Sequence, residues 1–214
     1  MEYYELYEVL KNYFDCGKNR VEPQELNVTI ESIPFESKVC DLLYGSEIQH
    51  CNKHQQTLEI NKKDHLFYGQ PAVDIKDFDI DCNKSFEYHI LKRADTEKAK
   101  GAIFLFHGLN EKKWDKYLPW AYELAQRTQK AIILFPIAFH MDRADPIWSS
   151  RHHMMEVVHF RKKKYPENMN YSYVNAAISS RLEAHPQRIF WSGLQTYSDI
   201  TEVVKDIKKG KIKS

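Results

Sequence analysis

Hydrophobic positions follow the clearest pattern between residues 101 and 140. Two short apolar runs, 102–106 (AIFLF) and 131–135 (AIILF), flank a segment with apolar residues at helical spacing from 118 to 125. Continuous apolar runs of this length are typical of strands that are buried on both faces, as in a parallel sheet. Because a helical pattern joins them, we expect a right-handed βαβ unit.

Helical spacing marks four further parts of the chain. Residues 2–14 carry an apolar stripe and predict an amphipathic helix. A short helix is predicted around 154–161. Two more follow at 170–184, with Ser172 as its N-cap, and at 187–209.

The remaining segments show strand-like or irregular patterns. Alternation of apolar and polar residues predicts strands over 73–80 and 86–92, paired as an antiparallel hairpin. Residues 15–70 are polar with little periodicity, and we interpret them as an irregular arm. The chain is therefore divided into a helix and irregular arm over 1–70 and an α/β domain over 71–214.

The loop that leaves the first buried strand is the candidate site. Its sequence is His-Gly-Leu-Asn-Glu, residues 107–111, and ligands gather at the carboxyl ends of parallel strands. Gly108 is expected to have a positive φ or to permit close backbone approach. Backbone N–H groups at Gly108, Leu109 and Asn110 are candidate donors to a developing oxyanion. The alternative is a plain turn between strand and helix.

Four side chains at the carboxyl ends of the two predicted parallel strands are candidate substrate-binding residues. His107 follows the first buried strand, and His140, Asp142 and Arg143 follow the second. For His107 the alternative is a buried ring that hydrogen-bonds to orient the turn. For Asp142 and Arg143 it is a loop stabilised by local hydrogen bonds.

These features resemble the α/β-hydrolase superfamily, in which a His-Gly motif after the third strand supplies part of the oxyanion hole. The match is closest to an uncharacterised bacterial branch with the loop at 107–111, a following Trp114, and a segment like 135–144 (FPIAFHMDRA). The resemblance covers roughly residues 70 to 210. It implies a partial hydrolase-like sheet, an initial hairpin plus parallel strands with flanking helices, and a small ester, amide or thioester substrate.

The nucleophile elbow of that superfamily, G-x-S-x-G, is absent from this sequence and its 7 glycines. We therefore interpret the chain as the N-terminal part of a serine-hydrolase-like protein that ends before the elbow. It would supply an oxyanion-type loop, contain no identifiable catalytic residue and be inactive alone. The alternative is a non-catalytic binding or interaction module with a hydrolase-like fold.

The resemblance also implies where the strand at 101–106 lies. It should neighbour the strand at 131–135 and turn its other edge toward the missing elbow strand. An unpaired apolar edge recruits partners, so we expect a homodimer or larger assembly. The alternative is that the arm over 15–70 covers this edge.

The charge composition argues against a nucleic-acid partner. The chain has 31 Lys and Arg residues and 30 Asp and Glu residues, so its net charge of +1 creates no overall positive potential that would attract nucleic acid. No apolar run is long enough for a membrane span, and the acidic amphipathic N-terminus is unlike a signal peptide. We expect a cytoplasmic protein without nucleic-acid or membrane partners.

Cysteine and histidine spacing gives little support for a metal. The four cysteines contain no C-x-x-C pair, and we interpret them as free thiols. Cys40, Cys51 and His54 form the one metal-like cluster, with His50 nearby, but structural zinc usually shows tighter paired spacing. We expect ordinary polar loop residues, no metal and no cofactor.

Overall fold

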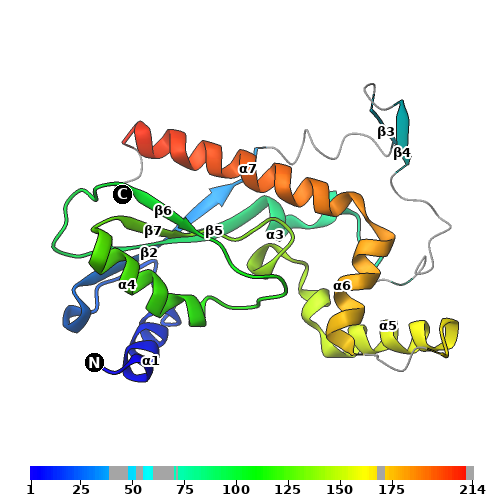
Figure 1. Cartoon of the computed structure of the whole chain (residues 1–214), viewed down its shortest axis with the longest axis horizontal. Helices are drawn as coiled ribbons and strands as arrows, with labels where there is room; N and C mark the ends of the chain where they lie inside the picture. The colour runs from blue at the N-terminus through cyan, green and yellow to red at the C-terminus, as the bar shows by residue number, and fades with distance from the viewer. Residues whose placement is uncertain (39–47, 52–54, 60–69, 71, 168–171, 211–214) are drawn as a thin grey trace.

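The computed structural model describes residues 1–38, 48–51, 55–59, 70, 72–167 and 172–210. These residues form an α/β fold with a five-stranded mixed sheet (Figure 1). The strands are β1 (Arg20–Val21), β2 (Val28–Glu36), β5 (Ser85–Arg93), β6 (Ala102–Leu105) and β7 (Ala131–Leu134), with β3 (Ile48–Cys51) and β4 (Gln56–Glu59) pairing apart from the sheet. The helices are α1 (Tyr3–Phe14), α3 (Asp81–Lys84), α4 (Leu118–Thr128), α5 (Arg151–Lys164), α6 (Tyr173–Ala184) and α7 (Gln187–Lys208).

The predicted βαβ unit is confirmed. Strands β6 and β7 pair in parallel, from Ala102 opposite Ala131 to Leu105 opposite Leu134, and α4 connects them. Pro119 lies in the first turn of α4, where no helical hydrogen bond needs its missing N–H. Gln129 then ends the helix in the left-handed conformation.

The predicted hairpin of 73–80 with 86–92 is wrong. The antiparallel partner of β5 is β2, from Val28 opposite Arg93 to Glu36 opposite Ser85. The region before β5 contains a 3₁₀ turn at Asp77–Asp79 and the short helix α3 instead. Its apolar residues pack beneath α5 to α7 rather than in the sheet.

Strand β2 lay hidden in the segment that we interpreted as irregular. Val28 and Ile30 point to one face of the sheet, whereas Ile33 and Phe35 point to the other. Apolar and polar residues alternate within each half of β2, but the apolar residues change from one face to the other in the middle of the strand. The apolar positions therefore do not follow one two-residue period along the whole strand. The nine-residue pairing with β5 identifies this segment as a strand, which its local sequence pattern does not.

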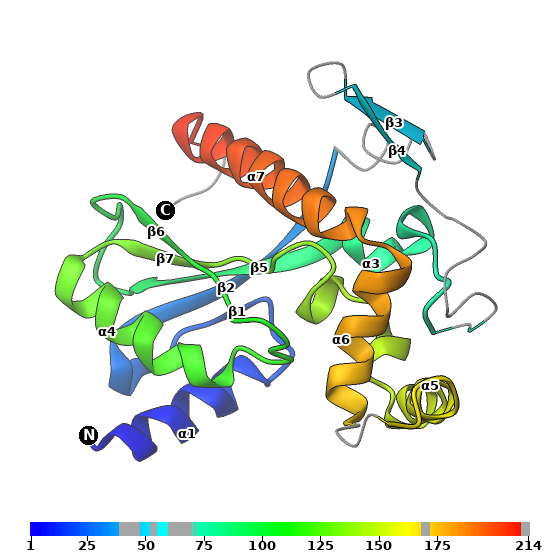
Figure 2. The same cartoon turned by 45° about the vertical axis from the view of Figure 1, so that its right-hand side comes forward.

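Two apolar layers cover the sheet (Figure 2). Helices α1 and α4 pack on one face through Leu10, Leu118 and Ala121. Helix α7 packs on the other through Val203 and its half-buried neighbours. Alternate residues of β7 divide between the two layers, so this strand is buried on both faces, as its continuous apolar run predicted.

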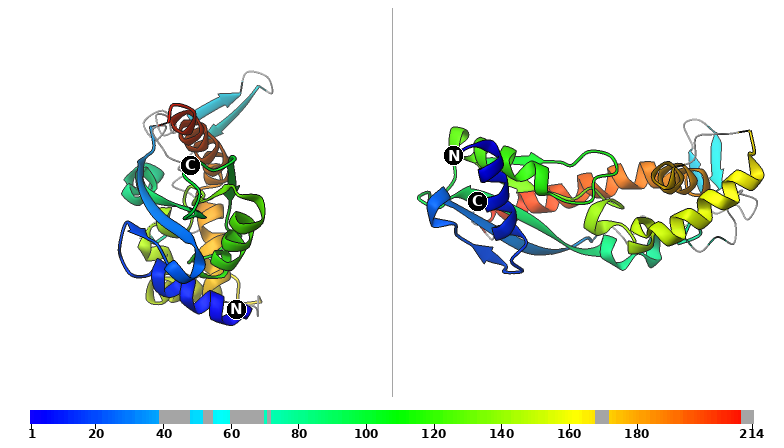
Figure 3. Two further views of the ribbon diagram at one scale, coloured as in Figure 1. Left: turned by 90° about the vertical axis from the view of Figure 1, so that its left-hand side faces the viewer. Right: turned by 90° about the horizontal axis from the view of Figure 1, so that it is seen from below.

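Helices α5 and α6 lie beyond the end of the sheet, which makes the molecule long in one direction (Figure 3). They share a third apolar cluster with the first turns of α7 and the loop after β7, including Phe139, Trp148 and Trp191. This cluster fixes α6 and α7 beside the carboxyl ends of β6 and β7. The carboxyl end of the sheet is therefore bounded by helices as well as loops.

Strand β6 forms one border of the sheet, whose order is β1–β2–β5–β7–β6. Among the described strands it pairs with β7 alone, and its residues are half-buried. The expected pairing of this strand with the strand at 131–135 is confirmed. Strands β1 and β2 lie at the opposite border.

Among the described residues, no helix combines the length and the apolar character that a bilayer crossing requires.

Candidate functional site

His107 ties together the two loops that leave the parallel strands. Its Nε2 accepts a hydrogen bond from the Ile137 N–H at 3.0 Å, and its Nδ1 lies 3.0 Å from the Gly108 carbonyl oxygen, to which it donates. The ring is 5% exposed and packs edge-on against Trp114. Burial lowers the pKa of His107, which favours the neutral ring that these two bonds require. The geometry matches the alternative in which His107 orients the turn.

Gly108 does not have the expected positive φ. Its N–H donates to Tyr117 Oη at 2.6 Å, so this donor is already occupied. The left-handed residue of the turn is Asn110 instead, with φ of 63°. Asn tolerates that conformation because its short polar side chain can hydrogen-bond locally, and the sharp bend falls two residues later than predicted.

The oxyanion candidates therefore narrow to Leu109 and Asn110. Within the described residues, neither backbone N–H has a hydrogen-bond partner, although the Glu111 N–H closes the turn onto the Gly108 carbonyl at 3.4 Å. Leu109 is 72% exposed and lines a cavity described below. These two amides remain available to an external acceptor.

His140 lies beside His107, with ring centroids 5.8 Å apart, but its bonding differs. Its Nδ1 donates to the Ala138 carbonyl at 2.9 Å, and no described residue bonds to Nε2. Burial lowers the pKa of His140, and the cations Arg181 and Lys112 lower it further. A neutral ring with Nδ1 protonated leaves Nε2 as a free acceptor.

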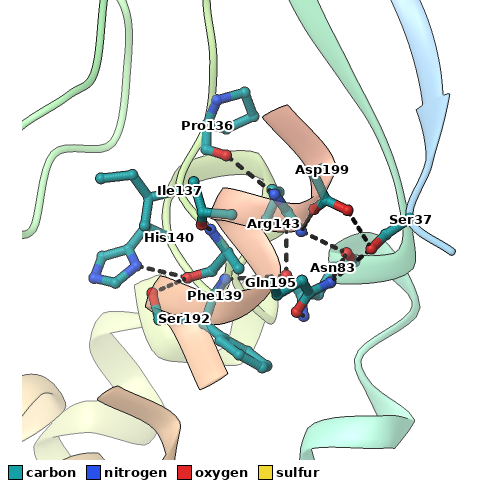
Figure 4. A network of polar contacts seen from close by, with 12 residues as sticks. Ser37, Asn83, Pro136, Ile137, Phe139, His140, Arg143, Ser192, Gln195 and Asp199 are labelled. Atoms are coloured by element: carbon teal, nitrogen blue, oxygen red, sulfur yellow. Dashed lines mark hydrogen bonds and ion pairs between the residues drawn. The ribbon is translucent and has the colours of Figure 1, made fainter. Parts of the chain in front are cut away.

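Asp142 and Arg143 lie in a 3₁₀ turn, Met141–Arg143, after β7. Asp142 is exposed, and no hydrogen bond or ion pair involves its carboxylate within the described part of the chain. Arg143 points inward and is 0% exposed. Figure 4 shows the guanidinium at the centre of a polar network.

Other protein groups occupy the hydrogen-bond donors of the Arg143 guanidinium. Nη2 lies 2.8 Å from Asp199 Oδ2 on α7, Nε donates to Asn83 Oδ1 at 3.2 Å, and Nη1 donates to the Pro136 carbonyl at 3.2 Å. The guanidinium also stacks on Phe86, 3.8 Å from the ring centroid. Arg143 therefore offers no surface to a ligand in this structure. Its side chain is held mainly by partners distant in the sequence, Asn83 and Asp199, and not by the local hydrogen bonds of the alternative.

Asn83 and Gln195 complete this network. Asn83 Nδ2 donates to Gln195 Oε1 at 2.9 Å, and Asn83 Oδ1 accepts from the Phe139 N–H at 3.1 Å. Ser37 donates to Asp199 Oδ1 at 2.6 Å. The network thus joins the end of β2, α3, the loop after β7 and α7, and it fixes the backbone that carries His140.

A cavity of about 300 Å³ opens between the two loops and helices α6 and α7. The residues around it are Leu109, Phe139, His140, Ile178, Arg181, Leu182, Arg188, Ile189 and Ser192. Ser192 Oγ donates to the same Ala138 carbonyl as His140, at 2.9 Å. The cavity brings together two predicted site residues, Leu109 and His140.

The α6 and α7 side chains of this cavity were missed by the sequence analysis. Arg181, Arg188 and Ser192 occupy helices that the apolar periodicity identified correctly. A signal existed in α6, where Arg181 lies one turn after Ala177 and Ile178 on the apolar side of the predicted helix. Only the packing of α6 against the sheet end shows what that side faces.

Among the described residues, no group of three His, Cys, Asp or Glu side chains is arranged to hold a metal ion. Cys40 and His54 of the metal-like cluster, and the side chains of His50 and Cys51, lie outside the described residues.

Comparison with curated proteins finds no match. Comparison with solved structures also finds none. A protein-family model does match, over residues 1–214, and the chain accordingly belongs to a family of unknown function, DUF6051.

Proposed function

We propose that this chain forms the oxyanion-loop side and the substrate wall of a serine-hydrolase-like acyl site. The observation that carries the proposal is the pair of unbonded amides at Leu109 and Asn110, at the carboxyl end of β6 and beside the cavity that holds His140. Paired amides of this kind stabilise the oxyanion of acyl transfer. The substrate is a small ester, amide or thioester.

The sheet order supports the same proposal. An antiparallel pair, β2 with β5, is followed by β7 and then β6, which is the order that the α/β-hydrolase resemblance implies. In that fold the strand with the nucleophile pairs with the border that β6 leaves open. No G-x-S-x-G occurs among the 214 residues, so in this proposal the nucleophile is supplied from outside them.

Hydrolysis of p-nitrophenyl butyrate tests the proposal. The 214-residue chain alone should show no saturable turnover, because oxyanion donors without a nucleophile and base give only roughly 10³- to 10⁴-fold over water. The coding sequence that surrounds these residues in the gene should contain a G-x-S-x-G strand followed by an acid and a His. Protein made from that whole reading frame should hydrolyse the ester, and Leu109→Pro, which removes one amide donor at a turn position whose φ is not positive, should lower kcat more than it raises KM.

Saturable hydrolysis by the 214-residue chain that survives purification would contradict the proposal that the nucleophile is supplied from outside these residues. A reading frame without the elbow, together with no turnover, would favour the second function, a non-catalytic binding module. One observation favours that second function: residues of this chain, from the loops after β6 and β7 and from α6 and α7, line a cavity of about 300 Å³.

The open border of β6 leads to a proposal about assembly. Unpaired strand edges template further pairing, and here Phe106 is 39% exposed at the end of β6. We expect the isolated chain to form a homodimer or larger assembly through this border. Light scattering at low micromolar concentration, combined with slow hydrogen exchange over 102–105, would support pairing. A monomer with fast exchange there would contradict it.

A further inference from the structure

The cavity between α6, α7 and the two loops has an apolar lining with a few polar groups. Phe139, Ile178, Leu182 and Ile189 provide apolar walls, and Arg181 provides a cation. Its volume of about 300 Å³ is at the small end of the range for ligand sites. An apolar lining with one or two placed polar groups selects a ligand that has an apolar body and one polar end.

Arg181 carries a charge that the described protein does not neutralise. Its Nε donates to the Ala177 carbonyl of its own helix at 2.6 Å, and its guanidinium stacks on Trp148 at 4.3 Å. No carboxylate forms an ion pair with it in the described ranges, and the two terminal nitrogens have no hydrogen-bond partner there. Burial and the neighbouring Arg188 lower the pKa of Arg181 to about 10.

The second arginine of the cavity, Arg188, differs from Arg181 because it has a carboxylate partner. Arg188 Nη2 lies 2.6 Å from Asp77 Oδ1, and the same nitrogen donates to the Ile75 carbonyl at 3.0 Å. This ion pair offsets the charge of Arg188. Arg181 is therefore the cation left to attract a ligand.

The surroundings of Arg181 add to the positive potential. Lys112, from the loop after β6, donates to Ser149 Oγ at 2.9 Å, and its pKa is lowered by burial and by Arg181. A like charge disfavours the protonated form of its neighbour, so the lowered pKa of Lys112 reflects the positive charge of Arg181. An anion next to Arg181 would relieve this repulsion.

We propose that this cavity binds a small amphiphilic carboxylate, with the carboxylate on the Arg181 guanidinium and an aliphatic body against Ile178, Leu182 and Ile189. Arg matches carboxylate geometry and can bind it through two parallel hydrogen bonds. The inference rests on the proposed function in taking the cavity as the acyl-substrate site. It assigns the substrate class as a carboxylate-bearing aliphatic compound.

Isothermal titration of the 214-residue chain with three probes tests the inference. Hexanoate should bind, hexan-1-ol should bind roughly 10- to 100-fold more weakly because it lacks the charge, and inorganic phosphate should not bind measurably. Arg181→Gln should lower hexanoate affinity to that of hexan-1-ol. Arg127→Gln, which alters an exposed arginine on α4, is the matched control and should leave binding unchanged.

Two further variants distinguish a loss of ligand contacts from a general loss of folding. Arg181→Lys keeps the charge and should retain a preference for hexanoate over hexan-1-ol, whereas Ile178→Trp fills the cavity and should weaken both probes. Equal binding of hexanoate and hexan-1-ol by the natural sequence would overturn the role of Arg181 without any variant. Phosphate binding as tight as hexanoate would overturn the aliphatic body, and no binding of any probe would overturn the site.

Binding is measured without turnover, so the two proposals fail separately. Hexanoate binding with no ester hydrolysis from the whole reading frame would remove the hydrolase and keep the ligand class. Ester hydrolysis by that protein without a preference for carboxylate ligands would keep the hydrolase proposal and remove the proposed ligand class.

Discussion

Two arginines near the carboxyl end of the sheet differ in what surrounds them. All three guanidinium nitrogens of Arg143 donate to protein groups, and Asp199 offsets its charge at 2.8 Å. Arg181 donates once, to its own helix, and no described carboxylate pairs with it. A buried charge with a complete set of partners stabilises one conformation of the protein, whereas a charge without partners is a candidate for binding.

The neighbouring histidines show the same difference. Both ring nitrogens of His107 are hydrogen-bonded, to Gly108 and Ile137, whereas His140 uses Nδ1 alone. His107 and Arg143 therefore belong to the framework that positions the loops. His140 and Arg181 border the cavity and keep unused polar atoms.

The largest effect is expected in the Arg143 network. Asp199→Asn leaves the Arg143 guanidinium buried without its counter-charge and should lower the free energy of unfolding by about 3 to 5 kcal/mol. Glu123→Gln removes an exposed carboxylate that pairs with Arg127 and should change it by less than about 1 kcal/mol. Urea denaturation measures both. Similar losses in the two variants would show that the network is not a framework.

Acid should destabilise the protein through buried histidines. Burial lowers the pKa of His89 to about 4, and its Nδ1 lies 2.9 Å from Ser32 Oγ. Because the unfolded chain takes up this proton first, near pH 6.5, stability is full above that pH and is lost as pH falls toward 4, by up to about 3 kcal/mol.

Urea denaturation between pH 7 and 4 measures this loss, and His89→Asn should remove most of it. His152→Asn, at an exposed position of α5, is the control and should follow the natural sequence. A His89→Asn profile identical to that of the natural sequence would show that His89 is protonated equally in both states.

The two site histidines should respond differently to truncation. His107→Ala leaves the Ile137 N–H without its partner, and leaves the Gly108 carbonyl with only the long bond of 3.4 Å from the Glu111 N–H, so it should cost about 1 to 3 kcal/mol. His140→Ala should cost less, because Ser192 still donates to the Ala138 carbonyl. Thermal and urea unfolding compare the variants, and a larger loss for His140→Ala would reverse the assignment of framework and cavity.

The sequence predicts best where local pattern and tertiary environment agree. The two apolar runs at 102–106 and 131–135 are buried by helices on both sides, so their continuous character is enough to identify them. Strand β2 buries opposite faces in its two halves, and only its pairing with β5 shows it to be a strand.

The candidate site was predicted in part for the same reason. Strand ends place His107, Leu109 and His140 at one edge of the sheet, which a βαβ pattern predicts. The burial of Arg143 depends on Asp199, which is 56 residues away along the chain. The cavity side of Arg181 depends on how α6 packs, and no local pattern contains that information.

The smallest change in stability is expected at Arg181. Arg181→Gln removes a half-buried charge that has no described counter-ion, so the free energy of unfolding should change by less than about 1 kcal/mol. This contrasts with the large loss at Asp199. A loss of several kcal/mol for Arg181→Gln in urea would place Arg181 in the framework with Arg143.

A crystal structure grown with hexanoate tests the central claim most directly, because it locates the anion. The account predicts the carboxylate about 2.7 to 2.9 Å from the Arg181 guanidinium nitrogens, the range of charge-assisted hydrogen bonds. The aliphatic chain should lie against Ile178, Leu182 and Ile189, and the Arg143–Asp199 pair should be unchanged. Hexanoate bound elsewhere, or a protein carboxylate seated on Arg181 in the same crystals, would contradict it.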